Sequence, residues 1–118
     1  MIDTQYLNEN GIDAAATLER LNGNERLYER MLSLFLKDSN ASLLRTDTEA
    51  ESALMHSHTL KGLGGNLGFS RLYELTGRQC ALIREGRLSE ALSMSGEIAA
   101  EAERLQCVIR RMTGEREA

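Results

Sequence analysis

MHSHTLKGLGGNLGF, residues 55–69, lies in the middle of the chain between two apolar patterns of helical period, yet it contains four glycines. Each glycine inside a helix costs roughly 0.5–1 kcal/mol relative to alanine. Three of them, Gly62, Gly64 and Gly65, fall within about two helical turns. Because these glycines destabilise the predicted helix, their presence indicates a function that needs helix backbone without side chains.

The glycines clear the helix surface next to His58. At about 100° per residue, Gly62 and Gly65 follow His58 by one and two turns on the same side, and Lys61 lies beside it at i+3. We therefore predict an exposed imidazole with bare backbone on its C-terminal side and an ammonium group nearby. Gly64 falls toward the opposite, core-facing side, where a glycine favours close packing of two helices.

The run His58-Thr-Leu-Lys61-Gly62, followed by Gly65-Asn-Leu-Gly68, resembles the HxLKGxxxxxG signature of histidine-containing phosphotransfer (HPt) domains. Every defining position is filled, and the surrounding helical pattern has the length of such a domain. Ser57 departs from the alanine that the family often has before the histidine, but it is also small. The resemblance implies a bacterial multistep phosphorelay, in which His58 carries a phosphoryl group between receiver-domain aspartates of response regulators.

The residues around His58 have roles that suit this chemistry. A neutral imidazole nitrogen can attack an acyl phosphate, because histidine titrates near neutrality. Lys61 is placed to offset charge on the phosphoryl oxygens. The sequence has no GxxxxGK[ST] loop and no paired acids for Mg²⁺. We therefore expect no cofactor and no metal on this chain, Mg²⁺ on the partner receiver domain, and a carrier without turnover of its own, not an enzyme.

The approach of a partner to His58 depends on the neighbouring surface. Gly62 and Gly65 are expected to leave room for the partner. The apolar residues near His58 form either an exposed docking patch or part of the core: Leu54, Met55, Leu63 and Phe69. Of these, Leu54 and Phe69 are the candidates for contact with a partner.

Gln79 is a polar residue in the apolar stripe of the following predicted helix. It is a candidate for hydrogen bonding the second imidazole nitrogen of His58 and so fixing its tautomer, a purpose for which the family often has a polar residue on that helix. A register error of one turn would place Arg78 or Cys80 there instead, and the remaining alternative is a boundary glutamine that faces water.

His56 provides an internal comparison for His58. Thr59 and Leu60 follow His56 by one turn and Leu63 by two, so its surface is covered by side chains. We interpret His56 as an ordinary, partly exposed residue. His58, by contrast, would be an ordinary solvated histidine only if the glycines and Lys61 were ignored.

Composition indicates a single all-α domain. The chain has 118 residues, no proline and 4% aromatics. Its net charge of −4 disfavours nucleic acid and anionic membranes as partners, and no apolar run approaches the ~18 residues of a membrane span. We expect a soluble, cytoplasmic monomer. Cys80 and Cys107 are widely spaced and are interpreted as small buried residues in a reducing compartment.

The expected fold is an antiparallel, up-down-up-down four-helix bundle with one or two short N-terminal helices. One domain, residues 1–118, comprises an N-terminal cap over about 1–22 and a bundle over about 24–113. Asp13 and Asn24 are predicted N-caps, and Gly68 and Gly86 predicted helix ends. The long helices are expected over about 24–45, 48–67, 71–85 and 89–112, the last two capped by Ser70 and Ser89.

The apolar periodicity of two helices predicts their core faces. In the first long helix this face comprises Leu27, Met31, Leu34, Phe35 and Leu44. In the glycine-containing helix it comprises Ala53, Ser57, Leu60, Gly64 and Leu67.

Two other functions are conceivable for a helical chain of this composition. A helical interaction module could use the same exposed face to bind a protein without being phosphorylated. A four-helix metal or catalytic bundle would need Glu-x-x-His pairs on facing helices, and the sequence contains none. The phosphorelay interpretation leaves open whether the chain is free-standing or belongs to a hybrid sensor histidine kinase.

Overall fold

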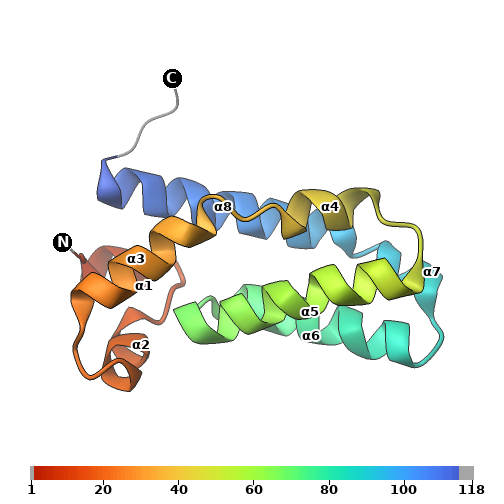
Figure 1. Ribbon diagram of the computed structural model, residues 1–118, viewed down its shortest axis with the longest axis horizontal. Coiled ribbons are helices and arrows are strands. Elements are labelled where there is room, and N and C mark those ends of the chain that lie inside the picture. Colours follow the sequence, from red (N-terminus) through yellow and green to blue (C-terminus); the bar gives the residue numbers. More distant parts are fainter. Residues whose placement is uncertain (1, 115–118) are drawn as a thin grey trace.

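The computed structural model describes residues 2–114, which are helical apart from short connections (Figure 1). The ends of the expected domain, residue 1 and residues 115–118, lie outside the described residues. One isolated antiparallel bridge, between Ile12 and Phe69, is the β-type pairing found in this range. The helices in chain order are α1 (Thr4–Glu9), α2 (Ala14–Arg20), α3 (Glu25–Phe35), α4 (Asn40–Thr46), α5 (Ala50–Leu67), α6 (Ser70–Arg84), α7 (Leu88–Leu92) and α8 (Ser95–Thr113).

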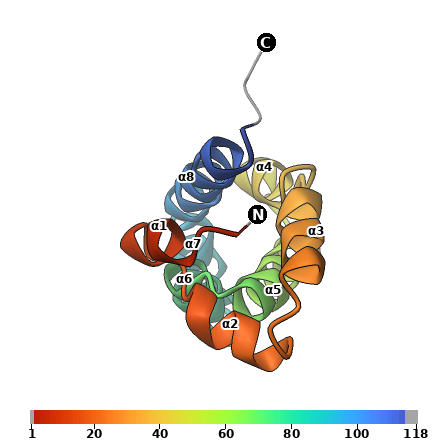
Figure 2. The ribbon, with the colours of Figure 1, turned by 90° about the vertical axis from the view of Figure 1, so that its left-hand side faces the viewer.

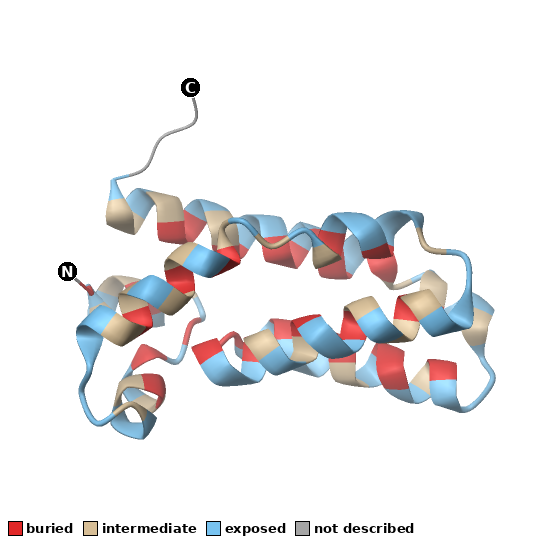
Figure 3. Ribbon diagram, viewed as in Figure 1, coloured by how far each residue is buried: buried red, intermediate tan, exposed pale blue. Residues whose placement is uncertain are grey.

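Helix α5 is central to the packing. It packs along α6 and also contacts α2, α3 and α4, while α8 contacts α3, α4 and α6. Viewed end-on, α3, α4, α5, α6 and α8 surround a common interior (Figure 2). Helices α1 and α2 lie at one end of the molecule (Figure 1). Buried residues recur along the inward faces of the helices (Figure 3). The all-α fold class is confirmed for the described residues.

The core face of α5 follows its sequence period. The five positions predicted to face inward are the buried residues of this helix: Ala53, Ser57, Leu60, Gly64 and Leu67. Gly68 then ends α5 in the left-handed conformation, with φ of +83°, as predicted. A residue without Cβ reaches this conformation at little cost. His58 is one position beyond the inward-facing Ser57, so the same rotation that buries Ser57 brings His58 out toward solvent.

Two predicted N-caps are also found. The Asp13 carboxylate accepts a hydrogen bond from the Ala16 backbone N–H at 3.1 Å at the start of α2. The Asn24 side-chain oxygen accepts one from the Leu27 N–H, also at 3.1 Å, at the start of α3. Both bonds satisfy backbone donors that the first helical turn leaves unpaired.

The N-terminal helices hold the C-terminal end of α5. The Asp13 backbone N–H donates to the Gly68 carbonyl at 2.8 Å, and the buried Tyr28 hydroxyl donates to the Leu67 carbonyl at 2.8 Å. Burial is the main cause that raises the pKa of Tyr28 to about 12. Two orphan carbonyls at the end of α5 are thereby satisfied from α2 and α3.

The helix expected over residues 24–45 is interrupted and forms α3 and α4. The Asp38 carboxylate accepts hydrogen bonds from the Asn40 backbone N–H at 2.9 Å and from the Asn40 Nδ2 at 2.8 Å. Such local side-chain bonds compete with continuation of a helix. Within α3 the buried face is Tyr28, Leu32 and Phe35. It is offset by one residue, about 100° of rotation, from the predicted Leu27, Met31 and Leu34, so Leu34 is 62% exposed instead of buried.

The helix expected over residues 89–112 is likewise divided, into α7 and α8. Ser89 lies inside α7 and is not a cap. At the break the Ala91 carbonyl accepts hydrogen bonds from the Met94 N–H at 3.0 Å and from the Gln79 Nε2 at 2.8 Å. The side chain of Gln79 therefore adds a second hydrogen bond to a backbone carbonyl at the helix break.

Two smaller expectations are wrong. Ser70 is the first residue of α6 and makes no side-chain capping bond, since Phe69 occupies the cap position. Cys80 is buried, but Cys107 is exposed on α8. Cys107 follows the buried Leu105 by about 200° of helical rotation and so faces away from the core.

Candidate functional site

His58 lies on the exposed side of α5. Within residues 2–114 its imidazole has no hydrogen-bond or ion-pair partner, whereas Ser57 and Leu60 on either side are fully buried. The predicted exposure of His58 is confirmed. Its ring nitrogens are therefore available to an external group.

The three helical glycines have different surroundings. A Cβ at Gly62 would meet no atom within 4 Å, so the helix surface one turn after His58 is open, as predicted. A Cβ at Gly64 would lie 3.2 Å from the Tyr73 backbone nitrogen and 3.4 Å from the Phe69 carbonyl oxygen, which agrees with the predicted close approach of α6. Gly65 differs from the prediction: a Cβ there would lie 3.2 Å from Tyr73 Cε1, so the space belongs to the Tyr73 ring.

Lys61 is half-buried between α5 and α6. Its Nζ lies 5.5 Å from the centroid of the Tyr73 ring, within the range of a cation–π contact. Its Cε would be 3.8 Å from a Cβ built at Gly77. Lys61, Tyr73 and Gly77 line one open groove along α6. The contact of the lysine is thus an aromatic ring of α6, and its action on a phosphoryl group at His58 stays a prediction.

Gln79 does not orient the His58 imidazole. Its side chain is fully buried, and Nε2 donates to the Ala91 carbonyl at 2.8 Å and to Ser95 Oγ at 3.1 Å. These partners belong to α7 and α8, and His58 is not among them. The sequence prediction for Gln79 is wrong because a polar residue in an apolar stripe can satisfy a helix break as well as a functional site. Of the alternatives, Cys80 is fully buried and Arg78 is exposed.

The apolar residues near His58 divide between the two alternatives. Phe69 is buried, with its ring centroid 4.8 Å from that of Phe35, so the expectation that it contacts a partner is wrong. Leu54 and Leu63 are half-buried against the core. Met55, one turn before His58, is 58% exposed. The exposed apolar surface beside His58 on α5 is therefore centred on Met55.

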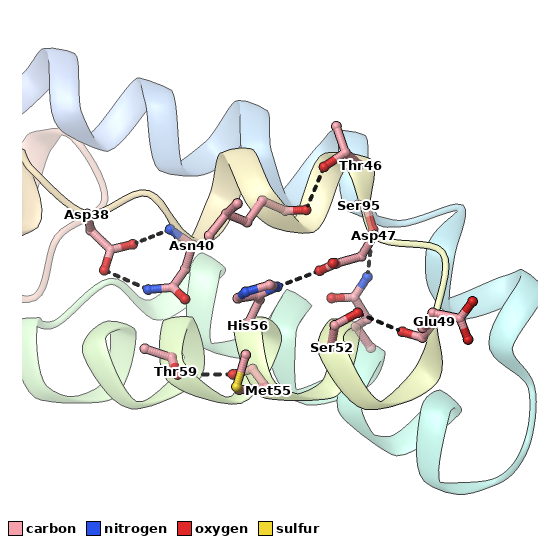
Figure 4. Close-up of polar contacts among 12 residues, drawn as sticks. Asp38, Asn40, Thr46, Asp47, Glu49, Ser52, Met55, His56, Thr59 and Ser95 are labelled. Carbon is pink, nitrogen blue, oxygen red and sulfur yellow. Dashed lines mark hydrogen bonds and ion pairs between the residues drawn. The ribbon is translucent and has the colours of Figure 1, made fainter.

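His56 is held by an acidic partner that sequence reasoning missed. Its Nδ1 lies 2.6 Å from Asp47 Oδ2, and the two side chains are 12% and 11% exposed. The contact joins α5 to the connection that follows α4 (Figure 4). His56 is thus partly buried, in agreement with the prediction, but its contact with a carboxylate was not predicted. Asp47 lies in the expected turn, nine residues before His56. A carboxylate in the turn that precedes the helix was the one sequence feature that could have indicated this contact.

No family model, curated protein or solved structure matches the chain. Within residues 2–114, no helix has the length and apolar composition needed to cross a membrane. In the same part of the chain, no three His, Cys, Asp or Glu side chains come together in a way that could hold a metal ion. The geometry around His58 is therefore the basis for a functional interpretation.

The open surface at Gly62 can be tested by a pair of alanine substitutions. We expect Gly62→Ala to raise the free energy of unfolding by about 0.5–1 kcal/mol, because alanine favours the helix and meets no neighbour. Gly64→Ala is expected to lower it, because the new methyl group presses on backbone atoms of Tyr73 and Phe69. Urea unfolding of both variants measures the difference. A destabilised Gly62→Ala protein would contradict the open surface.

Proposed function

We propose that this chain is a histidine-containing phosphotransfer domain of two-component signalling. His58 accepts a phosphoryl group from the aspartate of one receiver domain and passes it to the aspartate of another. The observation that carries the proposal is the exposed His58 imidazole, which has no polar partner among residues 2–114 and is followed one turn later by the open surface at Gly62. The HxLKGxxxxxG resemblance supplies the reaction.

The packing of the helices supports the proposal. Helices α4, α5, α6 and α8 contact one another in a ring, which is the arrangement that an antiparallel four-helix bundle with short N-terminal helices would have. In such a bundle the exposed side of one helix presents the histidine, and the opposite side belongs to the core. Ser57 faces the core, and His58, about 100° further around the helix, faces solvent.

The proposed reaction is an in-line displacement at phosphorus. The lone pair of the unprotonated His58 nitrogen forms a P–N bond while the P–O bond to the receiver aspartate breaks, and the aspartate leaves as a carboxylate. The other ring nitrogen keeps its hydrogen. Transfer to the second receiver reverses these roles: a carboxylate oxygen attacks phosphorus, and the imidazole leaves.

Charge compensation is divided between this chain and its partner. Lys61 is the cation on α5 closest in sequence to His58, and an ammonium group can pair with the phosphoryl oxygens. Mg²⁺ and its carboxylate ligands belong to the receiver in this proposal. The chain is thus a carrier that is itself phosphorylated, and its proposed setting is the cytoplasm.

The two histidines differ in a way that favours one acceptor. His56 is mostly buried and its Nδ1 contacts Asp47, whereas His58 is exposed and without a partner in the described part of the chain. A receiver loop can therefore approach the imidazole of His58 and not that of His56. Although the two histidines are two residues apart, only the His58 imidazole is accessible to a receiver domain in this proposal.

The chemical nature of the bound phosphate tests the proposal. The purified chain is incubated with a panel of receiver domains phosphorylated with ³²P, and the transferred label is treated with acid and with alkali. We expect label on the chain that is lost in acid and stable in alkali, as for a phosphoramidate. The absence of transferred label, or label with the stability of a phosphate ester, would count against the proposal.

Met55 favours a second candidate function. Its side chain is 58% exposed on the same helix as His58, and exposed methionines are common on protein-binding surfaces. An interaction module that uses this surface would bind a partner without acquiring phosphate. Binding of a receiver domain with no transfer of label would therefore support the second candidate over the first.

A further inference from the structure

The resting position of Lys61 is defined by one aromatic ring. Its ammonium nitrogen lies 5.5 Å from the centroid of Tyr73, which belongs to α6 and is 46% exposed. The negative face of an aromatic ring attracts a cation at this distance. Lys61 therefore has an interaction to lose before it can contact any other group.

Gly65 provides the space for that ring. A Cβ at Gly65 would lie 3.2 and 3.3 Å from Tyr73 Cε1 and Cδ1, closer than ordinary contact. The ring consequently lies against bare helix backbone, one turn beyond Lys61. The space beside Gly65, which the sequence suggested for partner access, is thus occupied by the Tyr73 side chain of the same protein.

The stem of Lys61 lies beside Gly77 of α6. A Cβ there would be 3.8 Å from Lys61 Cε, an ordinary contact distance. The aliphatic stem thus lies along α6, and the charged end reaches the Tyr73 ring. Of the two neighbouring glycines, Gly65 is the one whose missing side chain the contact requires, because the Tyr73 ring occupies that space.

We propose that Tyr73 is a positioning residue for Lys61: its ring holds the ammonium group while His58 is unmodified, and the ammonium leaves the ring for the phosphoryl group once His58 is phosphorylated. This inference rests on the proposed function. A phosphoryl group adds negative charge and strong acceptor oxygens one turn from Lys61. A charge-assisted hydrogen bond to these oxygens is stronger than a cation–π contact at a half-exposed ring.

The lysines of the chain make this position measurable. The chain contains Lys37 and Lys61 and no other lysine, so protein grown with ¹³Cε-lysine gives two ε-methylene NMR signals. A Lys37→Arg variant assigns them. Protons above an aromatic ring are shifted upfield by its ring current. We expect the Lys61 signal to lie upfield of that of Lys37, which is exposed and serves as the internal reference.

Substitutions at Tyr73 and Gly65 test the resting contact. Tyr73→Leu is expected to move the Lys61 signal to the position of Lys37, and Tyr73→Phe to keep it upfield, because the ring and not the hydroxyl makes the contact. Gly65→Ala displaces the ring and is expected to reduce the upfield shift, whereas Gly62→Ala is the matched control and leaves it unchanged. Circular dichroism verifies that each variant is folded. The proposal would be overturned if the wild-type Lys61 signal had the same chemical shift as that of Lys37, or if Tyr73→Leu did not change the Lys61 chemical shift.

Phosphorylation tests the release of Lys61. Phosphoramidate transfers its phosphoryl group to histidine with loss of ammonia, and ³¹P NMR reports the phosphohistidine. We expect the Lys61 signal to move downfield on treatment of the wild type and to stay in place in His58→Gln. If phosphohistidine forms at His58 and the Lys61 signal does not move, the proposed role of Tyr73 is wrong, whereas the proposed phosphotransfer function is not contradicted. If no phosphohistidine forms, the proposed function fails and the release of Lys61 fails with it.

Discussion

Replacing His58 with glutamine is expected to abolish phosphoryl uptake from a phosphorylated receiver domain, with a loss of at least about 1,000-fold in rate, or about 4 kcal/mol in the activation barrier. Glutamine is also polar and suits a helix, but its amide nitrogen has no lone pair available for attack on phosphorus. Because His58 is exposed and contacts no other described side chain through a hydrogen bond, the substitution leaves the fold intact. Rapid-quench measurement of label transfer gives the rate.

His56→Gln is the matched control for this experiment. It removes the other histidine of the chain, yet we expect label transfer to continue, since His56 is mostly buried against Asp47. The substitution weakens the link between α5 and the preceding connection, so rates are compared per folded molecule. Uptake that survives in His58→Gln and disappears in His56→Gln would reverse the assignment of the acceptor.

Replacing Gly68 with alanine is expected to lower the free energy of unfolding by about 3 kcal/mol. A left-handed backbone costs an L-residue about 1–2 kcal/mol, and Gly68 has φ of +83°. In addition, a Cβ there would lie 2.6 Å from both the Asp13 carbonyl oxygen and Thr17 Oγ1. The clash falls on the backbone of the residue that caps α2 and cannot be relieved by a side-chain rotation.

Gly86→Ala separates the two contributions. Gly86 also has a positive φ, +79°, but a Cβ there would meet no atom within 4 Å. We expect only the conformational cost, about 1–2 kcal/mol. Urea unfolding of both variants, with equal m-values, measures the contrast. Equal losses for the two substitutions would show that contact with α2 contributes nothing.

This contrast bears on the last glycine of the HxLKGxxxxxG pattern. In this chain Gly68 allows α2 to dock on the end of α5, since its carbonyl also accepts the Asp13 N–H. Its role is therefore structural, whereas Gly62 lies on the open surface beside His58. Two glycines of the same short motif can therefore have different physical roles.

Much of α5 could be predicted from the sequence because the requirement there is local. A helix of known period has one buried side, and the pattern of Ala53, Ser57 and Leu60 defines it. The exposure of His58 follows from the same rotation. The capping residues Asp13 and Asn24 were predictable for a similar reason, since each bonds a backbone group three residues away.

The remaining errors concern groups that come from elsewhere in the chain. A helical wheel places Gly65 on the side of His58 but does not reveal that Tyr73 of α6 covers it. The partner of His56 lies in the preceding turn, and those of Gln79 lie in α7 and α8. The break after α3 was missed because the apolar pattern continues through it, while the bonds between Asp38 and Asn40 act against it.

The attachment of α5 at both ends has a consequence for how partners are told apart. Tyr28 and Asp13 bond its last residues, and Asp47 contacts His56 near its first turns. We therefore expect the backbone that carries His58 to keep one position, because α5 is held by contacts near both of its ends. Under the proposed function, the donor and acceptor receiver domains bind the same backbone conformation of α5 as rigid bodies. Specificity for one or the other then depends on surface side chains and not on bending of the helix.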